Sequence, residues 1–299
     1  MSEGLAVTPG RALRREMARG CVAMPGAFNA GVARLVERAG FRAVYVSGAG
    51  LANGAAGVPD IGLLGLSEVA QLAGHVASAV HIPAVVDADT GFGGPKDAAQ
   101  AVERFERAGL AGLHIEDQVF PKRCGHLGGK ELVSARQMAQ KIRAAVGARC
   151  DKDFLVIART DARAVEGFDA AIERARLYLE AGADAIFPEA LETAGEFRRF
   201  AKEVRAPLMA NMTEFGRGPL LSVRQLQSMG FRMVIFPMAL FRVAMKAAEQ
   251  CLGDLKRRGT QRQWLGRMQT RAELYDLLDY DPAQSHWPPE GGLCKEVSK

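Results

Sequence analysis

The chain has 299 residues, of which 48% are hydrophobic and 24% are charged, and its formal net charge is +5. This length fits one large α/β domain or two ordinary ones, and no apolar run reaches the roughly 18 residues that a membrane-spanning helix needs. The positive charges are spread along the chain without a basic block interleaved with aromatic residues, so neither nucleic acid nor a membrane is an expected partner.

The five cysteines are scattered, odd in number and without a CxxC pair. They therefore predict neither a disulfide framework nor a zinc ribbon. The N-terminus carries several arginines but no apolar segment of a secretory signal, and Glu3 and Glu16 argue against a mitochondrial presequence. We expect a protein of the reducing cytoplasm.

Apolar runs alternate with amphipathic helical patterns along the chain. The predicted strands are 21–25, 43–48, 82–89, 112–117, 154–161, 185–189, 207–212 and 233–237. The predicted helices include 67–80, 96–108, 135–146, 170–181, 224–228 and 239–257, with a further helical tract to about residue 278. Alternation of this kind predicts a parallel sheet covered by helices.

A weak internal repeat supports a closed arrangement. Four predicted helices end on a glycine that is followed within about three residues by a strand, at Gly40, Gly109, Gly182 and Gly230. Together with the eight predicted strands, this repeat of strand and helix predicts an α/β (β/α)8 barrel of the TIM type. An open doubly wound sheet is the alternative, but no GxGxxG follows the first strand and no P-loop occurs.

We expect one barrel domain over residues 1–299. It includes a C-terminal helical extension at about 239–281, which could cover the barrel or pack on another subunit. Residues 282–299 are rich in proline and glycine and are expected to be a poorly ordered tail.

Polar side chains follow the ends of the predicted strands, where the catalytic residues of parallel barrels gather. Any one of them could be a helix N-cap or an exposed loop carboxylate. Because the strand bodies are apolar, the combination favours an active site. The polar ends are Ser47–Gly50, Asp87 and Asp89, Glu116 and Asp117, Arg159–Asp161, Glu189, and Asn211–Glu214.

Asp87 and Asp89 are spaced to share one face of a strand. Two carboxylates on one face favour Mg²⁺, which prefers oxygen ligands. A zinc site is less expected because the five histidines show no paired ligand spacing.

The segment Lys122-Arg123-Cys124-Gly125-His126 places a cysteine among cations, which lower the pKa of a thiol. Such a thiol can donate a proton near neutral pH. The alternative is a buried structural cysteine. Arginines offer bidentate donors to carboxylates, and the Ser47–Gly50 backbone can approach an anion closely. The sequence thus predicts a site for a small polyanion bound through Mg²⁺.

The runs VDADTGFG, GLHIEDQ and KRCGH resemble the isocitrate lyase/phosphoenolpyruvate mutase superfamily. The segments ARTDARAVEGFDAAIERA, FPEA, NMTEFG and MQTRAELY resemble its methylisocitrate-cleaving branch, and the likeness spans about residues 22–280. The resemblance implies a Mg²⁺-dependent lyase that cleaves the tricarboxylate 2-methylisocitrate to pyruvate and succinate, in the methylcitrate cycle of propionate breakdown. It also implies a homotetramer in which the eighth helix is swapped between subunits.

The resemblance also implies residue roles. Asp87 and Asp89 would hold the metal, and Cys124 would be the active-site thiol. Ser47, Gly48 and Ala49 match the pyruvate-binding segment, although the family often has a second glycine in place of Ala49. The other implied substrate contacts are Gly125, Arg159, Glu189, Asn211, Met212, Thr213, Arg242 and Arg271. Residues with supporting or catalytic roles near the site are Tyr45, Asp60, Lys122, Arg123 and His126.

Several related activities remain open at this point. Isocitrate lyase, dimethylmalate lyase and oxaloacetate hydrolase share the scaffold, and room for one methyl group is worth only about 1–3 kcal/mol. Phe187, Ile235 and Pro237 are the expected walls for that methyl group. A phosphonomutase is less expected because those enzymes lack the KRCGH motif, and a non-catalytic barrel would be expected to lose its carboxylates or its thiol.

Overall fold

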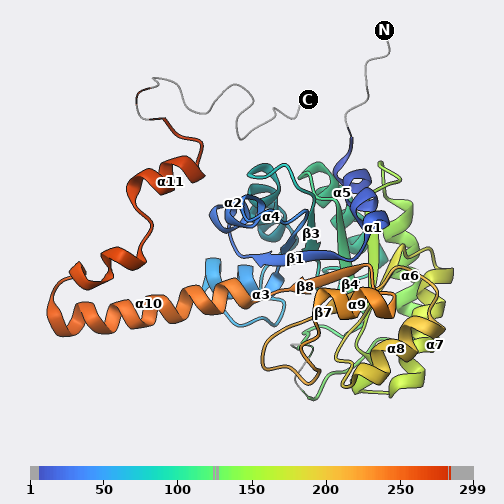
Figure 1. Cartoon of the computed structure of the whole chain (residues 1–299). Coiled ribbons are helices and arrows are strands. Elements are labelled where there is room, and N and C mark those ends of the chain that lie inside the picture. Colours follow the sequence, from blue (N-terminus) through green and yellow to red (C-terminus); the bar gives the residue numbers. More distant parts are fainter. Residues whose placement is uncertain (1–6, 124, 126–127, 282, 284–299) are drawn as a thin grey trace, which may run out of the picture.

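The structure is a computed structural model that describes residues 7–123, 125, 128–281 and 283. Eight parallel strands form one sheet in the order β6-β5-β4-β3-β2-β1-β8-β7. The two ends of this order meet at a parallel bridge between Ile186 and Leu208, so the sheet closes on itself (Figure 1). The prediction of a (β/α)8 barrel is confirmed, and the open sheet is excluded. The strands are β1 (Val22–Ala27), β2 (Val44–Val46), β3 (Ala84–Asp87), β4 (Gly112–Glu116), β5 (Leu155–Thr160), β6 (Ala185–Pro188), β7 (Met209–Asn211) and β8 (Met233–Phe236).

Helices alternate with the strands, and most start at a side-chain cap. Asn29, Ser134, Thr193 and Ser222 each accept a hydrogen bond from a backbone N–H of the first helical turn, as expected for N-caps. The α-helices are α1 (Pro9–Arg19), α2 (Ala30–Arg38), α3 (Gly48–Leu51), α4 (Leu66–Ser78), α5 (Pro95–Arg107), α6 (Ala135–Gly147), α7 (Phe168–Glu180), α8 (Ala194–Glu203), α9 (Val223–Met229), α10 (Ala239–Arg258) and α11 (Arg271–Leu277).

The barrel has two hydrophobic cores because alternate strand residues face opposite sides of the sheet. The larger core fills the space between the strands and the surrounding helices. The smaller one fills the barrel interior with residues such as Val85, Ile157 and Met209. Leu13 and Met17 of α1 belong to this inner core, so α1 closes the end of the barrel at which the strands begin.

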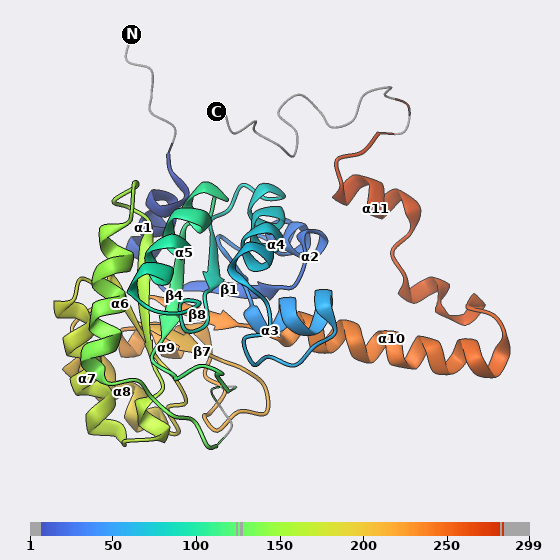
Figure 2. The ribbon, with the colours of Figure 1, turned by 180° about the vertical axis from the view of Figure 1, so that it is seen from behind.

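Helix α10 departs from this pattern. It projects away from the barrel in both views (Figures 1 and 2), and none of its 20 residues is buried. The chain then turns back, and the residues just after α11 are tied to α2 by an ion pair between Arg34 and Asp279 at 2.6 Å. Residues 239–281 are therefore a helical extension in this structure, whereas the expected tail at 282–299 lies outside the described residues except for residue 283. In the part of the chain that the structure describes, no helix could cross a lipid bilayer.

Candidate active site

Register between the strands brings functional side chains into two adjacent rows at the carboxyl end of the barrel. Asp87 of β3 is paired with His114 of β4. Two residues further along β4, Glu116 is paired with Arg159 of β5, which in turn is paired with Phe187 of β6. Residues paired in a parallel sheet point to the same face, so the charged groups of β3, β4 and β5 meet above the inner core.

Asp87 lies at the centre of a buried hydrogen-bonded group. Tyr45 Oη donates to Asp87 Oδ2 at 3.3 Å, and Nε2 of His114 lies 2.8 Å from the same hydroxyl. Burial raises the pKa of Asp87, but His114, Lys122 and Arg159 outweigh it and lower the pKa to about 2. Burial also lowers the pKa of His114 to about 4, so the imidazole is neutral near pH 7.

Tyr45 is held as a hydrogen-bond donor at this position. Burial and the nearby Asp87 carboxylate raise the pKa of Tyr45 well above its usual value. Its hydroxyl therefore keeps its proton near neutral pH, which makes the phenolate an unsuitable resting base.

Asp89 reaches Asp87 by a turn, which corrects the expectation that both residues share a strand face. Strand β3 ends at Asp87, and Asp89 has a φ of 47°. The Asp89 N–H donates to Asp87 Oδ1 at 3.0 Å, so the turn folds back on the first carboxylate. Burial and the neighbouring carboxylates raise the pKa of Asp89 to about 6, although Lys122 opposes this shift.

Lys122 is enclosed by carboxylates. Its Nζ lies 2.7 Å from Asp89 Oδ1 and is also paired with Asp60. Burial lowers the pKa of Lys122, but Asp89, Glu116, Asp60 and Asp87 together raise it well above its usual value. The Lys122 charge is thus engaged with these acids, in addition to the expected role beside the thiol.

Glu116 is a functional residue that the sequence reasoning placed at a strand end without assigning it a role. It is fully buried, and neither carboxylate oxygen has a hydrogen bond among the described residues. Burial raises the pKa of Glu116 well above its usual value, although Arg159 and Lys122 oppose the shift. Its signal in the sequence is the even spacing from His114, which places both side chains on the inner face of β4.

These carboxylates fit a divalent cation. Four of them act on a single ammonium, and the Glu116 oxygens make no hydrogen bond among the described residues, although Arg159 Nε lies 3.3 Å from one of them. The described residues form no ready cluster of three ligands at metal-binding distance. That arrangement suits Mg²⁺, which retains several waters and uses only one or two carboxylates directly. Asp87 and Asp89 would hold the ion, and Glu116 would accept from its waters.

Arg159 is the cationic centre of the site. Its Nε lies 2.9 Å from Asp161, 3.3 Å from Glu116 and 3.9 Å from Glu189, and the guanidinium sits 5.1 Å from the centre of the Phe187 ring. Burial lowers the pKa of Arg159, but the three carboxylates raise it well above its usual value. Arg159 is therefore a fixed cation that can bind a substrate carboxylate.

Gly125 brings the loop after β4 onto this centre. A Cβ at this position would collide with the guanidinium of Arg159 and the carboxylate of Glu189, so only glycine fits here. Cys124 and His126, the expected thiol and its neighbour, lie outside the described residues. Arg123 is described, and its side chain is exposed.

The Ser47–Ala49 segment starts a helix at the edge of the site. Ser47 caps α3 by accepting a hydrogen bond from the Gly50 N–H at 3.1 Å. A Cβ on Gly48 would lie 2.9 Å from Asp87 Oδ2, so this backbone approaches the Asp87 carboxylate closely. The segment was predicted as a strand end, but the backbone turns into α3 after Val46.

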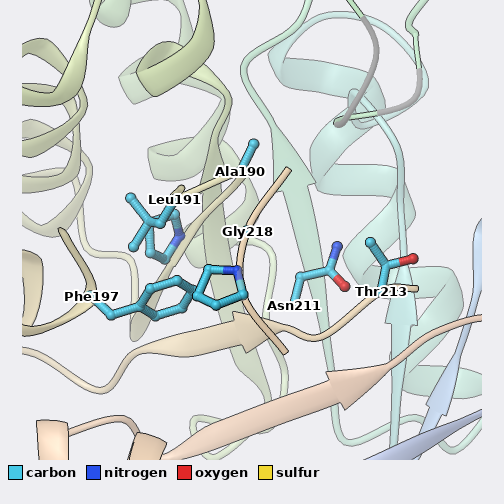
Figure 3. Close-up of a pocket in the computed structure, with 8 residues that line it drawn as sticks. Ala190, Leu191, Phe197, Asn211, Thr213 and Gly218 are labelled. Carbon is cyan, nitrogen blue, oxygen red and sulfur yellow. The ribbon is translucent and has the colours of Figure 1, made fainter. Parts of the chain in front are cut away.

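Strand β7 supplies amide and hydroxyl groups on the other side of Arg159. The Asn211 Nδ2 lies 3.3 Å from Glu189 Oε2, to which it donates. Asn211 and Thr213 line one side of a small pocket whose opposite wall includes Leu191 and Phe197 (Figure 3). The pocket volume is ≈ 10 Å³, enough for about one water, so the pocket is too small to contain a carboxylic acid substrate. Met212 turns away into the outer core.

The remaining predicted substrate residues lie on α10 and α11. Arg242, near the start of α10, pairs with Glu214 at 3.4 Å and stacks on Phe215. Arg271 is exposed at the start of α11, in the helical extension at 239–281 (the arm), and α11 lies outside the barrel (Figure 2). The structure therefore gathers the predicted residues of the strand ends and does not bring Arg271 to them.

One end of the barrel thus holds a buried guanidinium, a cluster of buried carboxylates and the backbone N–H groups at the start of α3. This combination is typical of enzymes that act on small carboxylate anions with the help of a metal ion. Comparisons with known proteins give the family. Residues 11–256 match the phosphoenolpyruvate phosphomutase family model, and the chain belongs to this family.

Relatives with known names narrow this assignment. The chain is 51% identical over 273 residues to a 2-methylisocitrate lyase of Aeropyrum pernix, covering 91% of this chain and 88% of that protein. It is 45% identical to a 2-methylisocitrate lyase of Escherichia coli, covering 91% and 93%. Among solved structures, 2,3-dimethylmalate lyase superposes with a TM-score of 0.87 at 37% identity, covering 91% and 92%. Phosphonopyruvate hydrolase in complex with oxalate and Mg²⁺ superposes with a TM-score of 0.82 at 32% identity, covering 91% and 95%.

Proposed function

We propose that this protein is a Mg²⁺-dependent lyase that cleaves 2-methylisocitrate to pyruvate and succinate, in the methylcitrate cycle of the cytoplasm. The observation that carries the proposal is that the carboxylates of Asp87 and Glu116 lie on the same face of the sheet as the Arg159 guanidinium, at the ends of three neighbouring strands. A tricarboxylate with a hydroxyl group needs both charges. The named relatives at 45–51% identity support this substrate over the other oxo acids of the family.

The reaction requires that a hydroxyl proton leaves, a carbon–carbon bond breaks, and the departing fragment gains a proton. Bound Mg²⁺ supplies a Lewis acid that polarises the hydroxyl and an adjacent carboxylate. Asp87 and Asp89 hold the ion, while the Ser47–Ala49 backbone receives the pyruvate half. Arg159 and Asn211 bind the carboxylates of the succinate half and stabilise the charge that develops there.

Cys124 delivers the final proton in this scheme. Its sequence neighbour Gly125 lies so close to Arg159 that a Cβ there would collide with the guanidinium, and this proximity supports a thiol beside the succinate half. The raised pKa of Tyr45 keeps that hydroxyl protonated, so it orients Asp87 while a carboxylate or water takes the hydroxyl proton.

The decisive assay compares kcat/KM for 2-methylisocitrate and isocitrate, with Mg²⁺ and with EDTA. We expect Mg²⁺-dependent release of succinate and a preference for the methylated substrate of about 10- to 200-fold, the range that one methyl group in an apolar pocket supports. Activity that is undiminished by EDTA, or a preference for isocitrate, would overturn the proposal.

A second activity is favoured by one observation, the high structural similarity to 2,3-dimethylmalate lyase. The residues expected to line the space for the methyl group, Phe187, Ile235 and Pro237, would decide between the two substrates. Phe187 is fully buried, edge-on to His114 at 5.2 Å, and lies beneath Arg159. Adding 2,3-dimethylmalate to the same assay separates this candidate, because release of propionate in place of succinate would identify it.

We propose further that α10 packs on a second copy of the chain, in a homotetramer with swapped helices. Apolar side chains along the arm are exposed, including Val243 at 69%, Leu252 at 65% and Leu265 at 61%. Exposed apolar residues in this number along one arm indicate a protein interface. The same exchange would carry Arg271 toward a neighbouring barrel.

The arm gives a direct prediction. Leu252→Glu is expected to shift the protein from an oligomer to smaller species, because a charge would be buried in the interface. Light scattering coupled to size-exclusion chromatography measures the mass. Lys256→Glu, on the polar end of the same helix, is the control and should leave the mass unchanged. An unaltered oligomer for Leu252→Glu would argue against this interface.

A further inference from the structure

Two buried side chains, Gln118 and Lys130, have no part in the scheme above, yet both hold the backbone of the loop after β4. Residues 118 and 132 form an antiparallel bridge at the base of this loop. The Val119 N–H also donates to the Glu131 carbonyl at 2.8 Å. Backbone pairing therefore holds the two ends of this loop together, and the residues between them depend on side-chain hydrogen bonds.

Gln118 supports the loop on one side of Cys124. Its Nε2 donates to the Arg123 carbonyl at 2.9 Å, and its Oε1 accepts from the Arg123 N–H at 2.9 Å. One carboxamide thus satisfies both backbone groups of one residue. Gln118 is only 1% exposed, so loss of these bonds would leave buried polar groups without partners.

Lys130 supports the loop on the other side. Its Nζ donates to the Gly125 carbonyl at 2.5 Å and to Asp161 Oδ1 at 2.7 Å. Asp161 in turn accepts from Arg159 Nε at 2.9 Å. The ammonium group therefore joins the loop backbone to the carboxylate that orients the substrate-binding guanidinium, and its side chain is 1% exposed.

We propose that Gln118 and Lys130 are positioning residues for the reaction. They fix the backbone of Arg123 and Gly125, the two sequence neighbours of Cys124, in register with Arg159. This inference rests on the proposed function, in which Cys124 is the acid. Neither residue contacts the reacting atoms, so their loss should slow proton delivery and leave substrate binding largely intact.

The test is steady-state kinetics of Lys130→Met and Gln118→Met. We expect kcat to fall by about 10- to 100-fold in each, the scale of a group displaced by about 1 Å, while KM changes little. Lys130→Met leaves Asp161 paired with Arg159, and Gln118→Met keeps every charge of the site. If Lys130→Met does not fold, as judged by circular dichroism, Gln118→Met decides alone.

Arg149→Met is a matched control at the opposite end of β5. Arg149 Nη1 donates to the Phe154 carbonyl at 2.9 Å and pairs with Asp184 at 2.7 Å, so it too holds one carbonyl and one carboxylate. This variant should lose thermal stability without loss of kcat. A fall in kcat equal to that of Lys130→Met would mean that the effect is general destabilisation and would overturn the inference.

A double variant separates positioning from indirect effects. In a Cys124→Ser background, Lys130→Met should reduce kcat by less than about threefold, because groups that act on one step are not additive. An additive loss would overturn the inference. Wild-type protein that does not cleave 2-methylisocitrate overturns the proposed function, whereas active wild type with undiminished variants overturns only the positioning roles.

Discussion

Cys124→Ser is expected to lower the turnover of 2-methylisocitrate by about 10² or more, the usual scale for loss of a proton-transfer group. A serine hydroxyl is a far weaker acid than a thiol whose neighbours are cationic. The substitution removes no charge and only changes sulfur to oxygen, so Mg²⁺ affinity and the melting temperature should be unchanged. Single-turnover release of succinate, measured at saturating Mg²⁺, gives the effect on chemistry.

Two other cysteines provide controls for this substitution. Cys150 is exposed, and Cys150→Ser should have wild-type turnover. Cys21 is buried, and burial raises its pKa to about 11, so it is not an acid near neutral pH. Turnover of Cys124→Ser close to that of Cys150→Ser would remove the thiol from the mechanism.

Arg159→Met is expected to abolish substrate binding and to lower the free energy of unfolding by about 3–5 kcal/mol, the cost of leaving buried charges without their partner. The guanidinium faces Asp161, Glu116 and Glu189, all of which are buried. Without it the Glu116 carboxylate must take up a proton or remain ionised at high cost, whereas Asp161 keeps its ion pair with Lys130. Urea unfolding at neutral pH measures the loss.

The control is a substituted arginine whose ion pairs are partly exposed to solvent. Arg163 pairs with Glu192 at 2.9 Å and Glu196 at 2.8 Å, and its side chain is 21% exposed. Arg163→Met should cost less than about 1 kcal/mol because solvent screens such pairs. If Arg159→Met also lowers the free energy of unfolding by less than about 1 kcal/mol, the arginine does not stabilise the buried cluster.

Hydrophobic periodicity and the glycines at helix ends predicted the barrel well because both depend on residues that are close together in the sequence. The glycines expected to end helices with a left-handed residue do so, with φ values of 85°, 84°, 102° and 106° at Gly40, Gly109, Gly182 and Gly230. The course of α10 was not predictable in the same way. Its apolar residues recur at helical spacing, and that pattern does not say whether the helix packs on its own barrel or on another chain.

The candidate site was predicted in its charged residues but not in their pairing. Asp87, Asp89 and Arg159 follow predicted strands, and the structure brings them together. The ion pair of Lys122 with Asp60 depends on residues 62 positions apart in the chain, which local sequence does not encode. The strand predicted at 82–89 is two residues too long at each end, and at its C-terminal end the reason is that the positive φ of Asp89 leaves no mark in the hydrophobic pattern.

Helix α1 determines which end of the barrel is open to small molecules. Leu13 and Met17 fill the end at which the strands begin, and Arg14 fixes the helix there by donating hydrogen bonds to the Asp153 carbonyl and to Asp184. With that end filled, we expect the substrate to enter, and both products to leave, at the carboxyl end of the strands.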